Sequence, residues 1–216
     1  MMALAALMAL GRTPQGSPKT RIVALGDSTT AGTPGWKSPL EAPPRGQGDE
    51  TSQYAYWLMQ AHQEWEVLNR GVNGERSDEI RRRFDRDVLD LRPAAVVIIA
   101  GVNDVYQGRP VEHVIEQLRD MYDRSKRAGI RIVAGTIVPY NTATPEQNDK
   151  MHRINAWIRA RADSDVAFVD TRRAVAAPGN PDKLIDSADS LHPSPAGYRL
   201  MAEAIQPVLE QLLRGR

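Results

Sequence analysis

The feature that most constrains the fold is an uninterrupted apolar run at residues 94–100. A continuous, largely β-branched run of this length is typical of a parallel strand buried on both faces of a sheet. Other short apolar segments share this character and alternate with segments of helical periodicity. The predicted strands are residues 21–25, 66–69, 94–100, 131–137 and 166–169. The predicted helices are residues 52–63, 77–91, 111–122 with an end at Gly129, 145–162, and a last helix that begins at Ser194 and Pro195.

Strands that alternate with helices predict a parallel sheet covered on both sides, with right-handed crossovers. A chain of 216 residues is long enough for one such domain with a substantial core. We therefore predict an α/β protein: a three-layer α/β/α sandwich around a five-stranded parallel sheet, flavodoxin-like in plan. Residues 21–216 are expected to form this domain, and residues 1–20 to be an apolar segment followed by a linker.

The first ten residues are apolar, but they are too few to span a bilayer. No basic n-region precedes them, as a signal peptide would require. A truncated signal peptide, a misassigned start and a short surface helix all remain open. The location is accordingly cytoplasmic or, if residues 1–10 are part of a signal peptide, secreted or periplasmic. No integral membrane segment is predicted elsewhere.

Charge and cysteine content exclude several classes of function. Basic and acidic residues number 28 and 27, which gives no electrostatic basis for binding nucleic acid. The run Arg81-Arg82-Arg83 is interleaved with acidic residues, so it predicts a solvated helix face. The absence of cysteine excludes disulfides, thiolate nucleophiles and cysteine metal sites. The histidines and carboxylates lack a metal-ligand spacing, and neither a metal nor an organic cofactor is predicted.

Two short polar motifs are placed where they can meet. Gly26-Asp27-Ser28-Thr29 follows the first predicted strand, and Asp189-Ser190-Leu191-His192 precedes the last predicted helix. A serine hydroxyl needs an adjacent base to act as a nucleophile, and a carboxylate can hold a histidine in the required tautomer. Because ligand sites of α/β sheets form at the carboxyl ends of the strands, we expect Ser28, His192 and Asp189 to lie together.

Acyl transfer also needs hydrogen-bond donors aimed at the developing oxyanion. Gly74 follows the second predicted strand and can offer an unobstructed backbone N–H. Gly71 is the alternative donor in this segment, and Gly74 is preferred because it closes the pattern Asn-x-Gly-x-x-Gly. Asn103 follows the third strand and carries a side-chain amide, and Ser28 can add its own backbone N–H. We predict that these three donors converge above the sheet as an oxyanion hole.

These segments, in this order, resemble the SGNH (GDSL-like) hydrolase family over nearly all of residues 21–210. The resemblance implies strand order 2-1-3-4-5, Ser28 as nucleophile, Gly74 and Asn103 as oxyanion donors, and Asp189 and His192 as acid and base. Thr29 departs from the family pattern, which has leucine there. That position has no chemical role in the mechanism, so the change is expected to alter packing only.

Three further side chains are candidates for the substrate pocket. Residues 32–50 form a long Gly/Pro-rich loop after Ser28, and Trp36 is its only large aromatic residue. Tyr140 and Asn141 follow the fourth predicted strand. We expect the three to line the pocket, although a plain surface loop is an equal alternative for Trp36. Asp186 is a rival to Asp189 for the acid.

The predicted function is hydrolysis of a small-molecule carboxylic ester through an acyl-serine intermediate, with a short acyl or O-acetyl group favoured. A lysophospholipase, thioesterase or acyltransferase on the same site remains an alternative, because specificity lies in the loops. A non-catalytic flavodoxin-like binding domain is another, but it leaves the Asp189–His192 pairing unexplained. The sequence does not define an oligomeric state.

Overall fold

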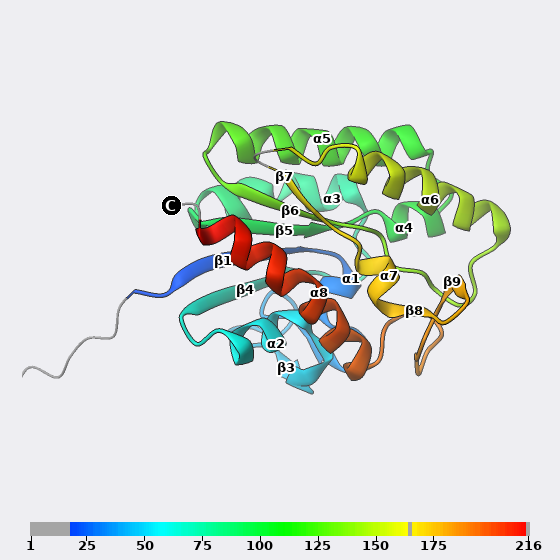
Figure 1. The fold of residues 1–216 in the computed structure, drawn as a ribbon, viewed down its shortest axis with the longest axis horizontal. Coiled ribbons are helices and arrows are strands. Elements are labelled where there is room, and N and C mark those ends of the chain that lie inside the picture. Colours follow the sequence, from blue (N-terminus) through cyan, green and yellow to red (C-terminus); the bar gives the residue numbers. More distant parts are fainter. Residues whose placement is uncertain (1–17, 164–165, 215–216) are drawn as a thin grey trace, which may run out of the picture.

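The computed structural model describes residues 18–163 and 166–214. Its centre is a five-stranded parallel sheet (Figure 1). In chain order the strands are β1 (Thr20–Gly26), β4 (Trp65–Gly71), β5 (Ala95–Ile99), β6 (Arg131–Gly135) and β7 (Val166–Val169). Their spatial order is β4-β1-β5-β6-β7, which is order 2-1-3-4-5 and confirms the predicted fold. The predicted apolar segment at residues 1–10 lies outside the described residues.

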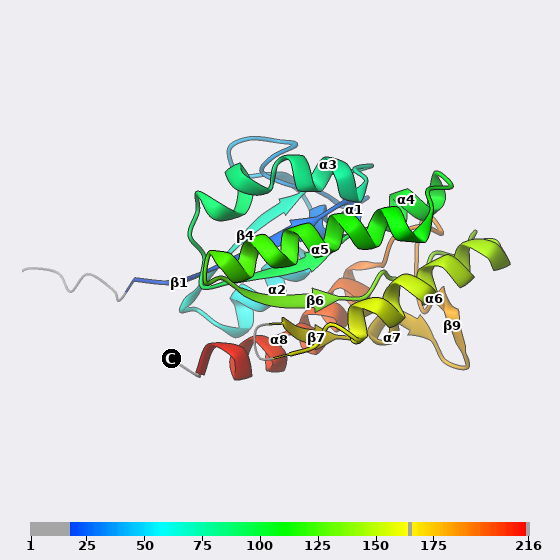
Figure 2. The same ribbon diagram turned by 90° about the horizontal axis from the view of Figure 1, so that it is seen from above.

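Helices cover both faces of the sheet, as Figures 1 and 2 show from two directions. The sheet can be covered twice because alternate residues of its strands point to opposite faces and both sets are apolar. In β1, Val23 and Leu25 pack on one side, whereas Ile22 and Ala24 pack on the other. The first side carries α3 (Ser77–Arg82), α5 (Val111–Arg127) and α6 (Pro145–Arg159), and the second carries α2 (Tyr54–Ala61) and α8 (Pro195–Arg214).

The register of the sheet brings three strand ends to one level. Gly26, the last residue of β1, is paired with Gly71 of β4 and with Ile99 of β5. The chain continues from these ends into α1 (Ser28–Ala31), into a loop at residues 72–76, and into α4 (Val102–Tyr106). The three segments that carry the predicted site residues Ser28, Gly74 and Asn103 therefore emerge side by side.

Several short elements were not predicted from the sequence. The long loop at residues 32–50 contains a small antiparallel pair, β2 (Trp36–Lys37) and β3 (Gln47–Gly48). A second hairpin, β8 (Ala176–Ala177) and β9 (Asn180–Leu184), follows the short helix α7 (Thr171–Val175).

The predicted helix at residues 77–91 is not continuous. It is α-helical only over α3, turns at Arg83, and resumes as a π-helical segment at Asp85–Leu89. The interruption coincides with tertiary contacts of the Arg83 side chain, which hydrogen-bonds backbone carbonyls of β1 and β4. Among the described residues, no helix is both long enough and apolar enough to cross a membrane.

Candidate active site

Ser28 is the first residue of α1 and lies at the tight turn that follows β1. The carboxylate of Asp27 caps this helix by accepting a hydrogen bond from the Thr29 N–H at 2.9 Å. A Cβ atom on Gly26 would lie 2.3 Å from the carbonyl oxygen of Ile99, so only glycine fits the close approach of β1 to β5 at this turn. The Ser28 residue is 4% exposed, and it is held at the carboxyl edge of the sheet.

His192 links Ser28 to Asp189. Its Nε2 lies 2.9 Å from Ser28 Oγ, and its Nδ1 lies 2.6 Å from Asp189 Oδ2. An ionised carboxylate can only accept hydrogen bonds, so Nδ1 carries the ring proton and Nε2 is free to accept from the serine hydroxyl. This is the orientation in which a histidine can take a proton from a serine nucleophile.

Asp189 also organises the loop that carries the histidine. Its Oδ1 accepts hydrogen bonds from the backbone N–H groups of Leu191 at 2.9 Å and His192 at 2.8 Å. Partial burial acts to raise the pKa of Asp189, but the hydrogen bonds from His192 and the two backbone groups outweigh it and lower that pKa to about 2. The rival Asp186 is exposed, and its backbone carbonyl accepts from Ser194 N–H.

Of the three predicted oxyanion donors, Ser28 and Asn103 line the cavity at Ser28, whereas Gly74 itself is not among the lining residues and its neighbour Asn73 is. Gly74 has a φ of 79°, a conformation that favours glycine, and a Cβ atom there would meet nothing within 4 Å. The backbone N–H groups of Ser28 and Gly74 form no hydrogen bond within the described part of the chain. The Asn103 amide uses one N–H for the carbonyl of Glu75 at 2.9 Å, which leaves its second N–H for a ligand.

The loop at residues 32–50 supports the loop that bears Gly74. Ser38 Oγ donates to the carbonyl of Gly71 at 2.6 Å. Glu41 Oε1 accepts from the Asn73 N–H at 2.9 Å. These two hydrogen bonds from residues 32–50 therefore hold the end of β4 and the loop that follows it in place.

A cavity of about 180 Å³ opens at Ser28. Tyr106 stands at its edge, 59% exposed, with its ring 6.0 Å from that of Tyr140 in an edge-to-face arrangement. Burial raises the pKa of Tyr140 to about 12, so its hydroxyl stays neutral. The cavity is lined by Ser28, Thr29, Asn73, Val102, Asn103, Tyr106, Tyr140, Leu191 and His192.

Of the three residues predicted to line the substrate pocket, only Tyr140 lines this cavity; Trp36 and Asn141 do not. The Trp36 residue is 7% exposed, and its ring packs over Gly46 within residues 32–50. Asn141 supports the histidine loop instead, because its N–H donates to Ser190 O at 2.7 Å and its Oδ1 accepts from Leu184 N–H at 2.7 Å. The expectation for Trp36 and Asn141 is corrected accordingly.

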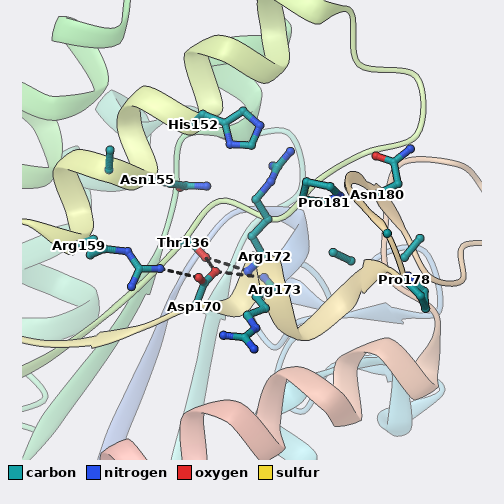
Figure 3. A pocket seen from close by; sticks show the side chains of 14 residues that line it. Thr136, His152, Asn155, Arg159, Asp170, Arg172, Arg173, Pro178, Asn180 and Pro181 are labelled. Carbon is teal, nitrogen blue, oxygen red and sulfur yellow. Dashed lines mark hydrogen bonds and ion pairs between the residues drawn. The ribbon is translucent and has the colours of Figure 1, made fainter.

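A larger cleft of about 750 Å³ lies between α6, α7 and the β8–β9 hairpin (Figure 3). Two of the three arginines that line it have carboxylate partners: Arg159 pairs with Asp170 and Arg172 with Asp182, both at 2.7 Å. Among its lining residues the hydroxyl of Thr136 is engaged by Asp170 and by the Arg172 backbone. This cleft therefore offers no free nucleophile, and the smaller cavity at Ser28 is the candidate active site.

One carboxylate–histidine cluster appears only in the structure. Ligand atoms of Asp78, Asp104 and His113, from α3, α4 and α5, lie within 4.8 Å of one another. Both Asp104 oxygens accept hydrogen bonds from Ser77, at 2.7 Å from N–H and 2.8 Å from Oγ–H. Burial raises the pKa of Asp104. The cluster joins α3 to α4, and no sequence spacing predicts it because its members lie on three separate elements.

A second buried carboxylate lies directly beneath the serine turn. Asp27 is buried, and within the described residues its Oδ2 has no hydrogen-bond partner. Burial raises the pKa of Asp27 to about 7, and the nearby Asp104 carboxylate adds to the rise. Its Oδ1 remains the cap of α1, which agrees with a role in the turn.

A doubly wound domain with a serine, a histidine and a carboxylate in series at the carboxyl edge of its sheet has the architecture of a serine-type ester hydrolase. The sequence agrees with this class. The family model described as the GDSL-like Lipase/Acylhydrolase family matches residues 24–200, and the chain belongs to that family.

Two individual relatives match parts of the chain. An acetylxylan esterase of Geobacillus stearothermophilus is 27% identical over 153 residues, which cover 64% of this chain and 69% of the relative. The uncharacterized lipoprotein YqeF of Bacillus subtilis is 30% identical over 125 residues, which cover 55% of this chain and 48% of YqeF, so the match spans about half of that protein.

Solved structures share the fold. A protein assigned to the G-D-S-L lipolytic family from Desulfitobacterium hafniense superimposes with a TM-score of 0.72 at 26% identity, over 88% of this chain and 99% of that one. An acetyl-xylooligosaccharide esterase from Geobacillus stearothermophilus gives a TM-score of 0.70 at 23% identity, over 89% and 94% of the two chains. The second likeness concerns the fold alone.

Proposed function

We propose that the protein hydrolyses esters of short acyl groups, with acetyl esters favoured, through an acyl-serine intermediate. The observation that carries the proposal is the hydrogen-bonded series from Ser28 Oγ through His192 to Asp189. Ser28 and His192 line a cavity of only about 180 Å³. The similarity to an acetylxylan esterase supports the acetyl preference.

In the proposed reaction Ser28 Oγ attacks the ester carbonyl carbon while its proton passes to His192 Nε2. The carbonyl oxygen becomes an oxyanion among the Ser28 N–H, the Gly74 N–H and the Asn103 amide. The carbon–oxygen bond to the leaving alcohol then breaks, and the alcohol takes the proton from His192. A water molecule attacks the acyl-serine, again with proton transfer to His192, and the acid leaves as the proton returns to Ser28.

Asp189 holds His192 in the required tautomer and offsets the charge of the imidazolium that forms. With its pKa lowered to about 2, this carboxylate is ionised at neutral pH. The exposed rim residues Tyr106 and Leu191 contact the part of the substrate that extends beyond the acyl group.

The first test is covalent labelling with a fluorophosphonate. The wild type should label with one probe per chain, and Ser28→Ala should abolish labelling and lower kcat by about 10⁴-fold or more. Ser194→Ala is the matched control, since this serine lies near the histidine loop but outside the cavity. Labelling that persists in Ser28→Ala would contradict the proposed nucleophile.

The second test addresses the substrate. p-Nitrophenyl acetate, butyrate and a long-chain ester are compared with acetylated sugars, a lysophospholipid and an acyl thioester. We expect kcat/KM to be highest for acetyl esters and to fall with chain length. A preference for the long chain, the lysophospholipid or the thioester would replace the acetyl esterase by that activity on the same site.

A further inference from the structure

We infer that Arg83 is a positioning residue that sets the serine turn and the oxyanion-binding segments in their relative places. The inference rests on the proposed function. The Arg83 side chain is 9% exposed, and its guanidinium contacts the carboxyl ends of two strands of the sheet. Nη2 donates to the carbonyl of Gly26 at 2.9 Å, and Nη1 donates to the carbonyl of Arg70 at 2.8 Å. The same side chain thus binds the end of β1, two residues before Ser28, and the end of β4.

The third arm of the guanidinium reaches the loop after β4. Arg83 Nε donates to Glu75 Oε2 at 2.6 Å. Glu75 follows Gly74 directly, and its backbone carbonyl accepts the hydrogen bond from Asn103 Nδ2 at 2.9 Å. One cation therefore connects the segments that carry all three proposed oxyanion donors: the turn of Ser28, the loop of Gly74 and, through Glu75, the amide of Asn103.

These contacts need an arginine. A guanidinium is a rigid plane with five N–H donors, whereas a lysine ammonium concentrates its three donors at one point. Here the acceptors meet Nε, Nη1 and Nη2 separately, and a single ammonium does not reproduce the spacing of these three nitrogens. The charge is compensated where it lies, because Glu75 and the buried Asp87 pair with Arg83 at 2.6 and 2.8 Å. Such compensation is required of a cation buried this deeply.

The local backbone is adapted to this arrangement. Arg83 ends α3, and the chain continues as the π-helical segment Asp85–Leu89 instead of a regular helix. Single π-helical turns within helices are rare and occur often at functional sites. Arg83 does not line the cavity at Ser28, so any effect on the reaction passes through Gly26, Glu75 and Arg70.

Displacement of donors by about 1 Å is enough to lower a turnover number by about 10²-fold. We therefore expect Arg83→Lys to lower kcat for p-nitrophenyl acetate by about 10- to 10²-fold while KM changes by less than about threefold. The rate of fluorophosphonate labelling should fall by a similar factor, since labelling uses the same donors. Melting temperature and circular dichroism report whether the variant is folded.

Arg86→Gln is the matched control. Arg86 lies three residues further on, is 67% exposed, and pairs with the same carboxylate of Asp87, but it forms no hydrogen bond to a strand end or to residues 72–76. It should change stability slightly and kcat by less than about twofold. A folded Arg83→Lys with wild-type kcat and a lowered melting temperature would assign Arg83 a purely structural role and overturn the inference.

Glu75→Gln keeps the inference testable if Arg83 variants do not fold. This variant retains the backbone carbonyl of residue 75 that binds Asn103. Its neutral amide oxygen accepts from Arg83 Nε more weakly than the carboxylate does, so kcat should fall by about three- to tenfold at nearly constant KM. Unchanged kcat in this variant would also overturn the inference. Failure of the proposed function is distinguishable, because the wild type would then not be labelled at Ser28 at all.

Discussion

The segments of Ser28, Gly74 and Asn103 are fixed by the sheet and by contacts from several elements, whereas Asp189 and His192 lie on a partly exposed loop outside the sheet. In the segments of Ser28, Gly74 and Asn103, here called the serine side of the site, the strand register and the Arg83 contacts set the geometry. In the loop of Asp189 and His192, here called the histidine side, the loop is closed largely by its own hydrogen bonds, from the N–H groups of residues 191 and 192 to Asp189.

The comparison shows two ways of placing a reactive group. The proposed nucleophile and oxyanion donors depend on long-range packing, so their positions are a property of the whole fold. The proposed base His192 and its partner Asp189 depend on a four-residue turn in which Ser190 has a φ of 64°, and on the hydrogen bond from Asn141 N–H to Ser190 O. Substitutions at Asp189 or His192 should therefore lower kcat strongly and leave the rest of the fold unchanged. Substitutions in the segments of Ser28, Gly74 and Asn103 should lower kcat by an amount that depends on which hydrogen-bond donor they remove.

Replacing Asp189 by asparagine should have the largest effect of the changes that test this comparison. The amide preserves the shape but permits the wrong histidine tautomer and no longer stabilises the imidazolium, so kcat should fall by about 10³- to 10⁴-fold. Asp186→Asn is the control, since this exposed side chain lies in the same loop. Equal losses in the two variants would mean that loop structure, and not the Asp189 charge, governs the rate.

Removal of the Asn103 amide tests the serine side. Loss of one oxyanion donor typically lowers turnover by about 10²- to 10³-fold, so Asn103→Ala should lower kcat by this factor with little change in KM. Asn103→Asp should be at least as damaging, because a carboxylate repels the oxyanion. Steady-state kinetics on p-nitrophenyl acetate decide the point: an effect mainly on KM would make Asn103 a substrate contact.

The sequence predicted most of the sheet because buried parallel strands leave a direct signal. Apart from Arg21, the predicted strands at residues 21–25 and 94–100 are apolar on both faces, and the observed β1 and β5 differ from them by one residue at each end. The reactive motifs were recognisable for a related reason: each follows a strand or precedes a helix, so its position at the carboxyl edge follows from the fold class.

What the sequence could not predict depends on tertiary contacts. The break at Arg83 follows from hydrogen bonds to β1 and β4, and nothing in residues 77–91 indicates them. Trp36 was expected near the acyl group because it follows Ser28 closely, but its ring is enclosed by its own loop. Nearness in sequence was a poor guide there, since α1 ends directly after Ser28–Ala31 at Gly32, which has a φ of 110°.

The buried Asp27 predicts a pH-dependent stability on the serine side. Its pKa is 3.8 in the unfolded chain and about 7 in the folded protein, so the folded state binds the extra proton in this window. The stability that this proton contributes to the folded state is fully present below the unfolded pKa of 3.8 and is lost as pH rises through the folded pKa of about 7. Asp27→Asn keeps an acceptor for Thr29 N–H but cannot ionise, so its melting temperature relative to wild type should be higher at pH 8 than at pH 5.

The shift should be several degrees, because about 1 kcal/mol moves the melting temperature of a domain of this size by about 2–4 °C. Asp49→Asn is the matched control: Asp49 caps the turn at Glu50–Ser52 through Thr51 N–H at 3.0 Å, but it is exposed. Identical pH dependence in wild type and Asp27→Asn would show that Asp27 does not hold its proton in the folded protein.

The smallest effect is expected at the rim of the cavity, where the two sides of the site meet. Tyr106 is exposed and packs edge-to-face on Tyr140, so Tyr106→Ala should widen the cavity without moving Ser28 or His192. The ratio of kcat/KM for butyrate to that for acetate should rise by about three- to tenfold, a modest change because an open rim discriminates less than a closed pocket. Trp36→Phe, buried away from the cavity, should leave this ratio unchanged while labelling of Ser28 persists in both variants. If the ratio changed in Trp36→Phe but not in Tyr106→Ala, residues 32–50 would have to be part of the substrate pocket. The serine side of the site, and not the rim at Tyr106, would then determine the preferred acyl length.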